Sequence, residues 1–337
     1  MKIYNFSLLF LIVQIFFSCT GKDSQPVFTM QLKTNDGEYV ALGDPFVYKH
    51  NGTYYMTGTS NPDSGFDYYT SNDLATWEYK GALFRPSENH FGKGFFWAPE
   101  VKFYQGKFFL TYSSLDKKSG LLLSALAVSD KPEGPFRELY APWFNIGKSA
   151  IDCHIFVDDD QDQTSYLFFS QNGAEEGYSY GKNYVVRLTK DLSKFEGEPV
   201  LVGEASQEWE KVNYATNRCN EGVFVLKHDG NYYMTYSANH TSYSHYGVGT
   251  ARAKHPLGPW IKDKDNPILF TDTKLGISSP GHSSIVESVD GRELHIVYHA
   301  HRNFDAPQPN DDRIAYIGRL YFNEAGNLRV KKNNIKN

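Results

Sequence analysis

Two stretches of the chain, DPFVYKHNGTYYMTGTS at 44–60 and EGVFVLKHDGNYYMTYS at 221–237, are nearly the same sequence. Each begins with a carboxylate, passes through an apolar run, reaches an Asn-Gly or Asp-Gly turn, and comes to Tyr-Tyr-Met-Thr soon after it. Two apolar and aromatic runs joined by such a turn predict a β-hairpin. The same hairpin therefore occurs twice, with Asp at the head of one copy and Glu at the head of the other.

Three more divergent copies of the hairpin start near Ala98, Ile151 and Gly281. The recurrence, at intervals of roughly 50 to 70 residues, indicates a repeat architecture. We align the heads of the five copies as Asp44, Pro99, Asp152, Glu221 and His282. Between hairpins lie segments such as GVGTARAKHPLGPWIKD (247–263), in which a polar turn separates two short strands. Each unit then holds about four strands.

Five such units predict an all-β fold, a five-bladed β-propeller with four-stranded antiparallel blades. A multi-sheet β-sandwich is the alternative, but a sandwich does not predict a period of matched hairpins. Residues 36–330 then form one domain, and helix is expected only in short stretches such as SQEWEKVN (206–213). The first strand of each blade lines the central axis, so the five heads converge at one end of it.

Composition and net charge limit the classes of function that the chain can have. The chain of 337 residues is 40% hydrophobic and 22% charged, which is typical of a globular protein. Its net charge of −5 gives no basic excess for binding nucleic acid. Aromatic residues make up 16%. They favour strands, and the flat faces of Tyr and Trp also suit sugar rings.

The N-terminus predicts export. Residues 1–18 form an apolar signal peptide too short to favour a transmembrane helix. The FFSC ending resembles a bacterial lipobox, which implies a lipid anchor on Cys19 and a tether over 19–35. The chain would then be a membrane-anchored lipoprotein, periplasmic or on the cell surface. An ordinary cleaved signal with an incidental Cys19 is the alternative.

Carboxylates gathered on an axis can do acid–base chemistry. Asp44, Asp152 and Glu221 cannot all remain ionised easily in one pocket, so their pKa values are expected to separate. A protonated acid beside an ionised carboxylate is the pair that glycoside hydrolysis requires. Calcium binding without catalysis is the alternative for the same cluster. The acidic run at 158–160 is expected to be a solvated turn.

The motifs GDPFVYKHNGTYYM, FWAPEV, IDCHIFVDDD, NEGVFVLKHDGNYYMTYS and GHSSIV together resemble the blade motifs of glycoside hydrolase family 43, over about residues 40–325. That family has a five-bladed propeller, inverts the anomeric centre and mostly removes arabinofuranose or xylose from plant polysaccharides. The resemblance implies that Asp44 is the general base, Glu221 the general acid and Asp152 the residue that orients the acid and tunes its pKa.

The same resemblance implies roles for three further residues. His282 matches a histidine near a central ion or water cluster, often calcium, although no cofactor is required for the chemistry. Arg313 falls where an arginine reaches the sugar, and Trp97 is either a stacking platform or blade packing. The family usually has Pro after the modulating Asp, where this chain has Cys153. Cys153 and Cys219 form either a disulfide or two reduced, buried thiols.

The function expected from these residues is an inverting glycosidase acting on arabinofuranosyl or xylosyl groups, with a carbohydrate as its partner. The alternatives are a related furanosidase, for example on galactofuranose, an endo-arabinanase, or a non-catalytic glycan-binding lipoprotein. The last is disfavoured because all three carboxylate positions are filled. Specificity is expected to depend on loops such as SENHFGKGFF (87–96).

Overall fold

The computed structural model describes residues 29–302 and 312–331. In this part of the chain, regular structure is strand except for one turn of 3₁₀-helix, η1 (Glu208–Glu210), which lies within the stretch expected to be helical. The all-β prediction is therefore confirmed. No helix in the described ranges is long and apolar enough to cross a membrane. The predicted signal peptide (1–18) and the lipidation site at Cys19 lie outside the described residues.

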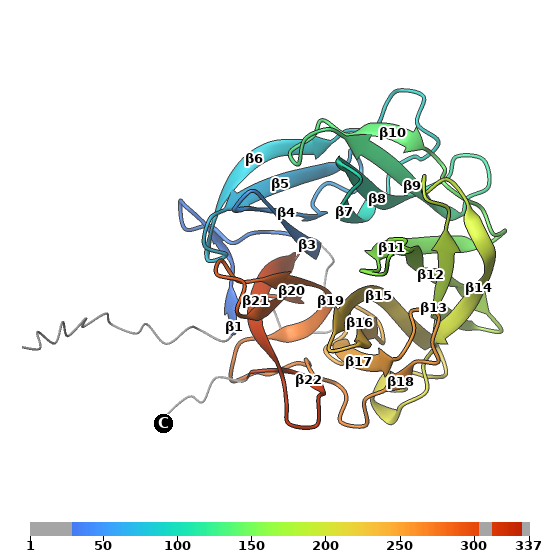
Figure 1. Cartoon of the computed structure of the whole chain (residues 1–337). Helices are drawn as coiled ribbons and strands as arrows, with labels where there is room; N and C mark the ends of the chain where they lie inside the picture. Colours follow the sequence, from blue (N-terminus) through green and yellow to red (C-terminus); the bar gives the residue numbers. More distant parts are fainter. Residues whose placement is uncertain (1–28, 303–311, 332–337) are drawn as a thin grey trace, which may run out of the picture.

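The strands β3 to β22 fall into five consecutive groups of four, arranged around a common centre (Figure 1). The strands nearest the centre are β3 (Gly43–His50), β7 (Trp97–Tyr104), β11 (Ser149–Val157), β15 (Asn217–His228) and β19 (Ser278–Glu287). The second strands are β4 (Thr53–Thr59), β8 (Lys107–Leu115), β12 (Ser165–Glu175), β16 (Asn231–Ala238) and β20 (Leu294–His301). These ten strands are the five hairpins of the sequence, and each inner strand contacts the next one around the ring.

Two outer strands complete each group. The third strands are β5 (Phe66–Ser71), β9 (Leu122–Ser129), β13 (Tyr178–Leu188), β17 (Gly247–Ala253) and β21 (Arg313–Phe322). The fourth strands are β6 (Thr76–Phe84), β10 (Arg137–Tyr140), β14 (Phe195–Gly203), β18 (Ile261–Lys262) and β22 (Leu328–Val330). Neighbours within each group are antiparallel. A short parallel pairing of β13 with β15 joins the third and fourth groups into one eight-stranded sheet.

Hydrophobic side chains fill the junctions between groups. Five clusters of buried residues are present in the described chain, one at each junction between neighbouring groups. Large aromatic side chains such as Trp77, Tyr112 and Phe168 are almost completely buried in them. A single four-stranded sheet cannot bury both of its faces alone, so each group depends on its two neighbours. The high aromatic content is explained largely by these junctions.

The chain ends are built into the ring. β1 (Thr29–Gln31) pairs with β21 of the last group, and β2 (Lys33–Thr34) pairs in parallel with β6 of the first. Leu32 between them is fully buried in the cluster that joins these two groups. The tether expected over 19–35 is therefore wrong from residue 29 onward, because Leu32 is buried and the segment forms strand pairs.

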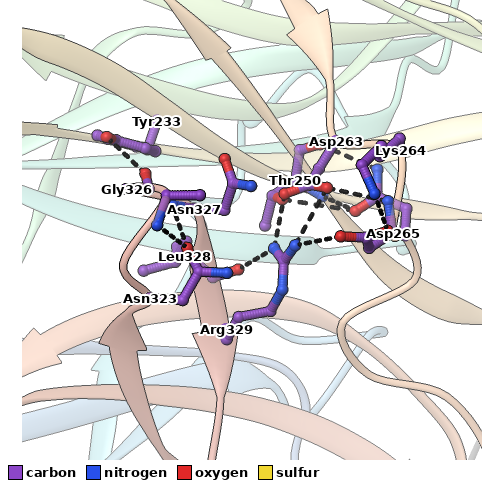
Figure 2. A network of polar contacts seen from close by, with 12 residues as sticks. Tyr233, Thr250, Asp263, Lys264, Asp265, Asn323, Gly326, Asn327, Leu328 and Arg329 are labelled. Carbon is purple, nitrogen blue, oxygen red and sulfur yellow. Dashed lines mark hydrogen bonds and ion pairs between the residues drawn. The ribbon is translucent and has the colours of Figure 1, made fainter.

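The last strand is held by charge as well. Arg329 of β22 pairs with Asp263 at 2.6 Å and with Asp265 at 3.0 Å, and both aspartates lie in the turn after β18 (Figure 2). In the same network the Tyr233 hydroxyl donates a hydrogen bond to the Gly326 carbonyl (2.9 Å). These contacts join the fourth group to the fifth at the outer edge of the ring.

Candidate active site

A β-bulge occurs at the same place in each inner strand. The pairing with the second strand shifts register once near the start of each inner hairpin, and in β19 the irregularity is longer. The first residue of each bulge has a positive φ: Asp44 (50°), Ala98 (46°), Asp152 (56°), Gly222 (60°) and His282 (47°). A bulge re-aims side chains locally and is common beside active sites. The five bulges therefore turn equivalent side chains toward one end of the ring.

The bulges correct the alignment of the hairpin heads. Gly222, and not Glu221, is equivalent to Asp44, and Ala98 replaces Pro99 in the second hairpin. Glu221 lies one residue earlier, where it pairs with Ser237 as Trp97 pairs with Ser113. The similar runs KHNGTYYMT (49–57) and KHDGNYYMT (227–235), aligned without a gap, already place Asp44 opposite Gly222, whereas alignment at the two carboxylates hides this offset. Successive strand residues point in different directions, so Glu221 approaches the centre differently from the two aspartates.

The predicted site residues meet at a cavity of about 540 Å³. It is lined by all six candidates from the inner and third strands: Asp44, Trp97, Asp152, Glu221, His282 and Arg313. Its size is within the usual range for a small-molecule site, roughly 300–1,000 Å³. Residues separated by more than 250 positions in the sequence thus share one pocket.

Asp44 is buried and surrounded by basic side chains. Its Oδ1 lies 2.8 Å from Arg313 Nη1 and 3.3 Å from His282 Nδ1, and its Oδ2 accepts a hydrogen bond from Thr59 Oγ1 (2.5 Å). Burial alone would raise the pKa of Asp44, but Arg313 and His282 outweigh burial and hold this pKa well below its usual range. Asp44 is therefore ionised even in mildly acidic solution.

Two histidines near Asp44 have opposite tendencies. Burial lowers the pKa of His299 to about 3, and its Nδ1 accepts a hydrogen bond from the Asp44 backbone N–H (3.1 Å). Burial also disfavours the charged form of His282, but the carboxylates of Asp44 and Asp152 outweigh burial and raise its pKa. His299 is thus a neutral acceptor, whereas the carboxylates around His282 favour its charged form.

Asp152 occupies the same bulge position as Asp44, but its pKa is shifted in the opposite direction. Burial raises its pKa to about 7, and the negative charges of Glu221 and Asp44 act in the same direction. Its Oδ2 accepts a hydrogen bond from the Gly222 backbone N–H (3.2 Å), directly beside Glu221. Asp152 is therefore placed where its protonation affects Glu221.

Both carboxylate oxygens of Glu221 accept hydrogen bonds. The Tyr246 hydroxyl donates to Oε1 (2.8 Å) and the Cys219 thiol donates to Oε2 (3.2 Å). Cys219 is a free, buried thiol, and so is Cys153, which donates to Ser124 Oγ (3.1 Å). The structure therefore has the two reduced cysteines and not the disulfide.

Two glycines leave room for the residues that reach the carboxylates. A Cβ atom on Gly43 would lie 2.1 Å from Arg313 Cζ, and a Cβ on Gly281 would lie 1.8 Å from the Tyr246 ring. Tyr246, His299 and Thr59 were not predicted from the sequence. Thr59 and His299 lie on the second strands of their hairpins and Tyr246 lies just before β17, whereas the sequence prediction considered mainly the residues at the heads of the inner strands.

The predicted ion near His282 has no ligand set in the described part of the chain. Among these residues, no group of three or more His, Cys, Asp or Glu side chains is arranged to hold a metal ion. The nearest ring nitrogen of His282 faces Asp44, to which His282 contributes positive charge. We therefore derive no chemical step through a metal, and a structural calcium remains a prediction.

Comparison with known proteins agrees with this geometry. A family model described as glycosyl hydrolases family 43 matches residues 40–328. The chain is 44% identical to a solved structure described as a thermostable family-43 glycoside hydrolase, with a TM-score of 0.82 over 87% of this chain and 93% of that one.

Curated relatives have related names. The chain is 29% identical to beta-D-galactofuranosidase xynD of Aspergillus niger, covering 85% of this chain and 81% of that protein. It is 25% identical to alpha-L-arabinofuranosidase 43 of Humicola insolens over 84% of this chain. The chain spans only 60% of the length of that second relative.

Proposed function

We propose that this chain, which belongs to glycosyl hydrolases family 43 and hydrolyses O-glycosyl bonds, is an inverting enzyme that releases α-L-arabinofuranosyl or β-D-xylosyl units from plant-type polysaccharides or oligosaccharides. One observation carries the proposal. Three carboxylates from three inner strands line one cavity, and among the described residues only Asp44 of the three forms an ion pair.

Asp44 is the proposed general base. An inverting enzyme needs an ionised carboxylate to take a proton from the attacking water. The Arg313 guanidinium and the His282 imidazole maintain that ionised form, which supports the assignment. Arg313 also lines the cavity, so it can contact the sugar while it holds Asp44.

Glu221 is the proposed general acid, and Asp152 its modulator. Glu221 approaches from β15, whose neighbours around the ring are β11 and β19 and not β3, and it shares no hydrogen bond or ion pair with Asp44 in the described structure. The proton of Asp152, whose pKa is raised to about 7, removes a negative charge from beside Glu221 near neutral pH. Inversion requires the carboxyl groups of Asp44 and Glu221 to lie roughly 6.5–9.5 Å apart, which leaves space for water.

The proposed architecture is a five-bladed β-propeller in which each group of four strands is one blade. The ring arrangement and the fivefold bulge support it, and the catalytic domain then includes the previously expected range 36–330. We also propose, from the first 19 residues alone, that the chain is exported and anchored at a membrane through a lipid on Cys19.

A second sugar remains a candidate. The similarity to a protein named beta-D-galactofuranosidase favours testing galactofuranosyl groups beside arabinofuranosyl and xylosyl groups. The retention of all three carboxylates argues against a binding protein without catalysis.

Leaving-group dependence tests the two roles. Glu221→Gln should retain much more activity on an activated aryl glycoside than on a natural oligosaccharide, because a good leaving group needs no proton. Asp44→Asn should lose activity on both substrates, because water activation is required in either case. Proton NMR of the first product should show an inverted anomeric centre.

Two results would contradict this proposal. One is an equal response of both variants to leaving-group quality, which would refute the assigned roles. The other is glycan binding by the wild type with no hydrolysis of any furanoside or pyranoside, which would favour the binding protein.

A further inference from the structure

Phe95 lies on the wall of the cavity in a segment that is fixed from two sides. The Phe96 N–H, next to it, donates a hydrogen bond to the Pro62 carbonyl (2.9 Å), which belongs to the first group of strands. On its other side, Ser114 Oγ of β8 donates to the Gly94 carbonyl (2.7 Å). The backbone of Phe95 is therefore held in place by contacts that do not involve its own side chain.

Two features of Phe95 do not stabilise the folded protein. Its φ is +55°, which is the left-handed region and is uncommon for a bulky residue. Its side chain is not removed from water either, because the residue is 46% exposed. Backbone strain of this kind is found preferentially at functional sites, where the surrounding structure maintains it.

The ring of Phe95 extends an aromatic wall outward from the reacting carboxylates. It packs edge-on against Trp97, with ring centroids 5.1 Å apart and an interplanar angle of 71°. Trp97 is itself partly buried and lines the same cavity. Asp44 and Asp152 are only 9% and 5% exposed, so the half-exposed Phe95 lies nearer to solvent than the residues that act on the bond.

We propose that Phe95 is a binding residue for the leaving group: the sugar ring on the far side of the scissile bond stacks on it. This inference rests on the proposed function, since it requires a glycoside whose terminal sugar sits at the buried carboxylates. The remainder of the substrate then leaves the cavity along the exposed wall. An aromatic face offers a carbohydrate ring an apolar surface that needs little reorganisation. The preferred substrate is accordingly a terminal unit linked to another sugar.

The test compares two substrates that share the terminal sugar released by the wild type. One is its methyl glycoside and the other is an oligosaccharide. We expect Phe95→Ala to lower kcat/KM for the oligosaccharide about three- to tenfold, mainly through KM, which is the range of an aromatic contact. The methyl glycoside should change by less than about twofold, because it has no ring to stack.

Two variants serve as controls. Phe95→Tyr should restore kcat/KM for the oligosaccharide, because it keeps the aromatic face. Phe270→Ala removes a phenylalanine that is 44% exposed and does not line this cavity, so both substrates should react as with the wild type.

Three results would overturn the inference. Equal losses on both substrates would show that Phe95 acts through Trp97 on the buried sugar. No loss on either substrate would show that the ring makes no contact with the leaving group. In both cases a fully active wild type would leave the proposed function standing. A wild type that hydrolyses no glycoside would instead overturn the proposed function and this inference together.

Discussion

At the residue scale, identical side chains at equivalent positions have acquired opposite properties. Asp44 and Asp152 both occupy the first residue of a bulge, yet the pKa of Asp44 is held well below its usual range and that of Asp152 is raised to about 7. Both are buried, so burial does not explain the difference. Arg313 does, because its guanidinium lies 2.8 Å from Asp44.

Asp152→Asn should stabilise the protein at alkaline pH while lowering activity. Between the ordinary aspartate pKa of 3.8 and the folded-state value of about 7, the unfolded chain has lost a proton that folded Asp152 keeps. Asp152 therefore lowers the free energy of unfolding progressively as the pH rises from about 4 to about 7. The variant should gain on the order of 4 kcal/mol relative to wild type between pH 4 and pH 8, measured by urea unfolding. A stability difference that does not change with pH would refute this account.

Tyr246→Phe should lower kcat/KM more for glycosides with poor leaving groups than for glycosides with good ones. The hydroxyl positions Glu221 by a 2.8 Å hydrogen bond, and the loss of such a bond costs about 1–3 kcal/mol where it leaves a buried acceptor unpaired. We expect at least a tenfold loss of kcat/KM on an alkyl glycoside and a smaller loss on a dinitrophenyl glycoside. Tyr54→Phe is the control, because it also removes a buried hydroxyl but one bonded to the Glu287 carbonyl. Equal losses on both substrates would assign Tyr246 a structural role only.

At the element scale, the bulged inner strand is the unit that builds the site. The first residue of each bulge turns its side chain toward the centre of the ring. The residue that precedes the bulge faces a different part of the cavity. In β3 that preceding residue is Gly43, across which Arg313 reaches Asp44. In β15 it is Glu221 itself.

Gly43→Ala should change the pH dependence of activity and also lower stability. The new Cβ would displace the Arg313 guanidinium from the buried Asp44, so the free energy of unfolding should fall by about 1–3 kcal/mol. Loss of the nearby cation raises the pKa of Asp44, and the acidic limb of kcat/KM should move to higher pH. Arg313→Gln should move the limb in the same direction. An unchanged limb in both variants would show that Arg313 does not control Asp44.

At the scale of the whole molecule, the ring is closed by segments distant in the sequence. β1 joins the last group, Leu32 is buried between the last group and the first, and Arg329 links the fourth group to the fifth. The cavity is lined by residues from several groups of strands, so the site requires a closed ring.

Arg329→Met should lower the free energy of unfolding by about 1–2 kcal/mol, because it leaves the buried Asp263 without its partner. The loss should shrink in 1 M salt, where charges are screened. KM should not change, because Arg329 does not line the cavity. Lys107→Met is the control, since its pair with Asp130 is exposed and worth little. Equal losses in both variants would contradict a specific role of Arg329 in joining the fourth group to the fifth.

The sequence by itself determined the all-β class, the five hairpins and the carboxylates that share a cavity. Hairpins and turns are local, so their signals survive in a single chain and repeat with each unit. The choice between a disulfide and two thiols and the burial of Leu32 were decided only by tertiary structure.

The partners of the carboxylates were also beyond the sequence. Tyr246, His299 and Thr59 come from outside the repeated inner strand, and no local pattern marks them. Whether Asp44 or Asp152 holds a proton depends on distances to charges elsewhere in the chain, since electrostatic interactions depend on position in space. The sequence therefore supplied the acidic residues, and the folded ring set the ionisation of Asp44 and Asp152.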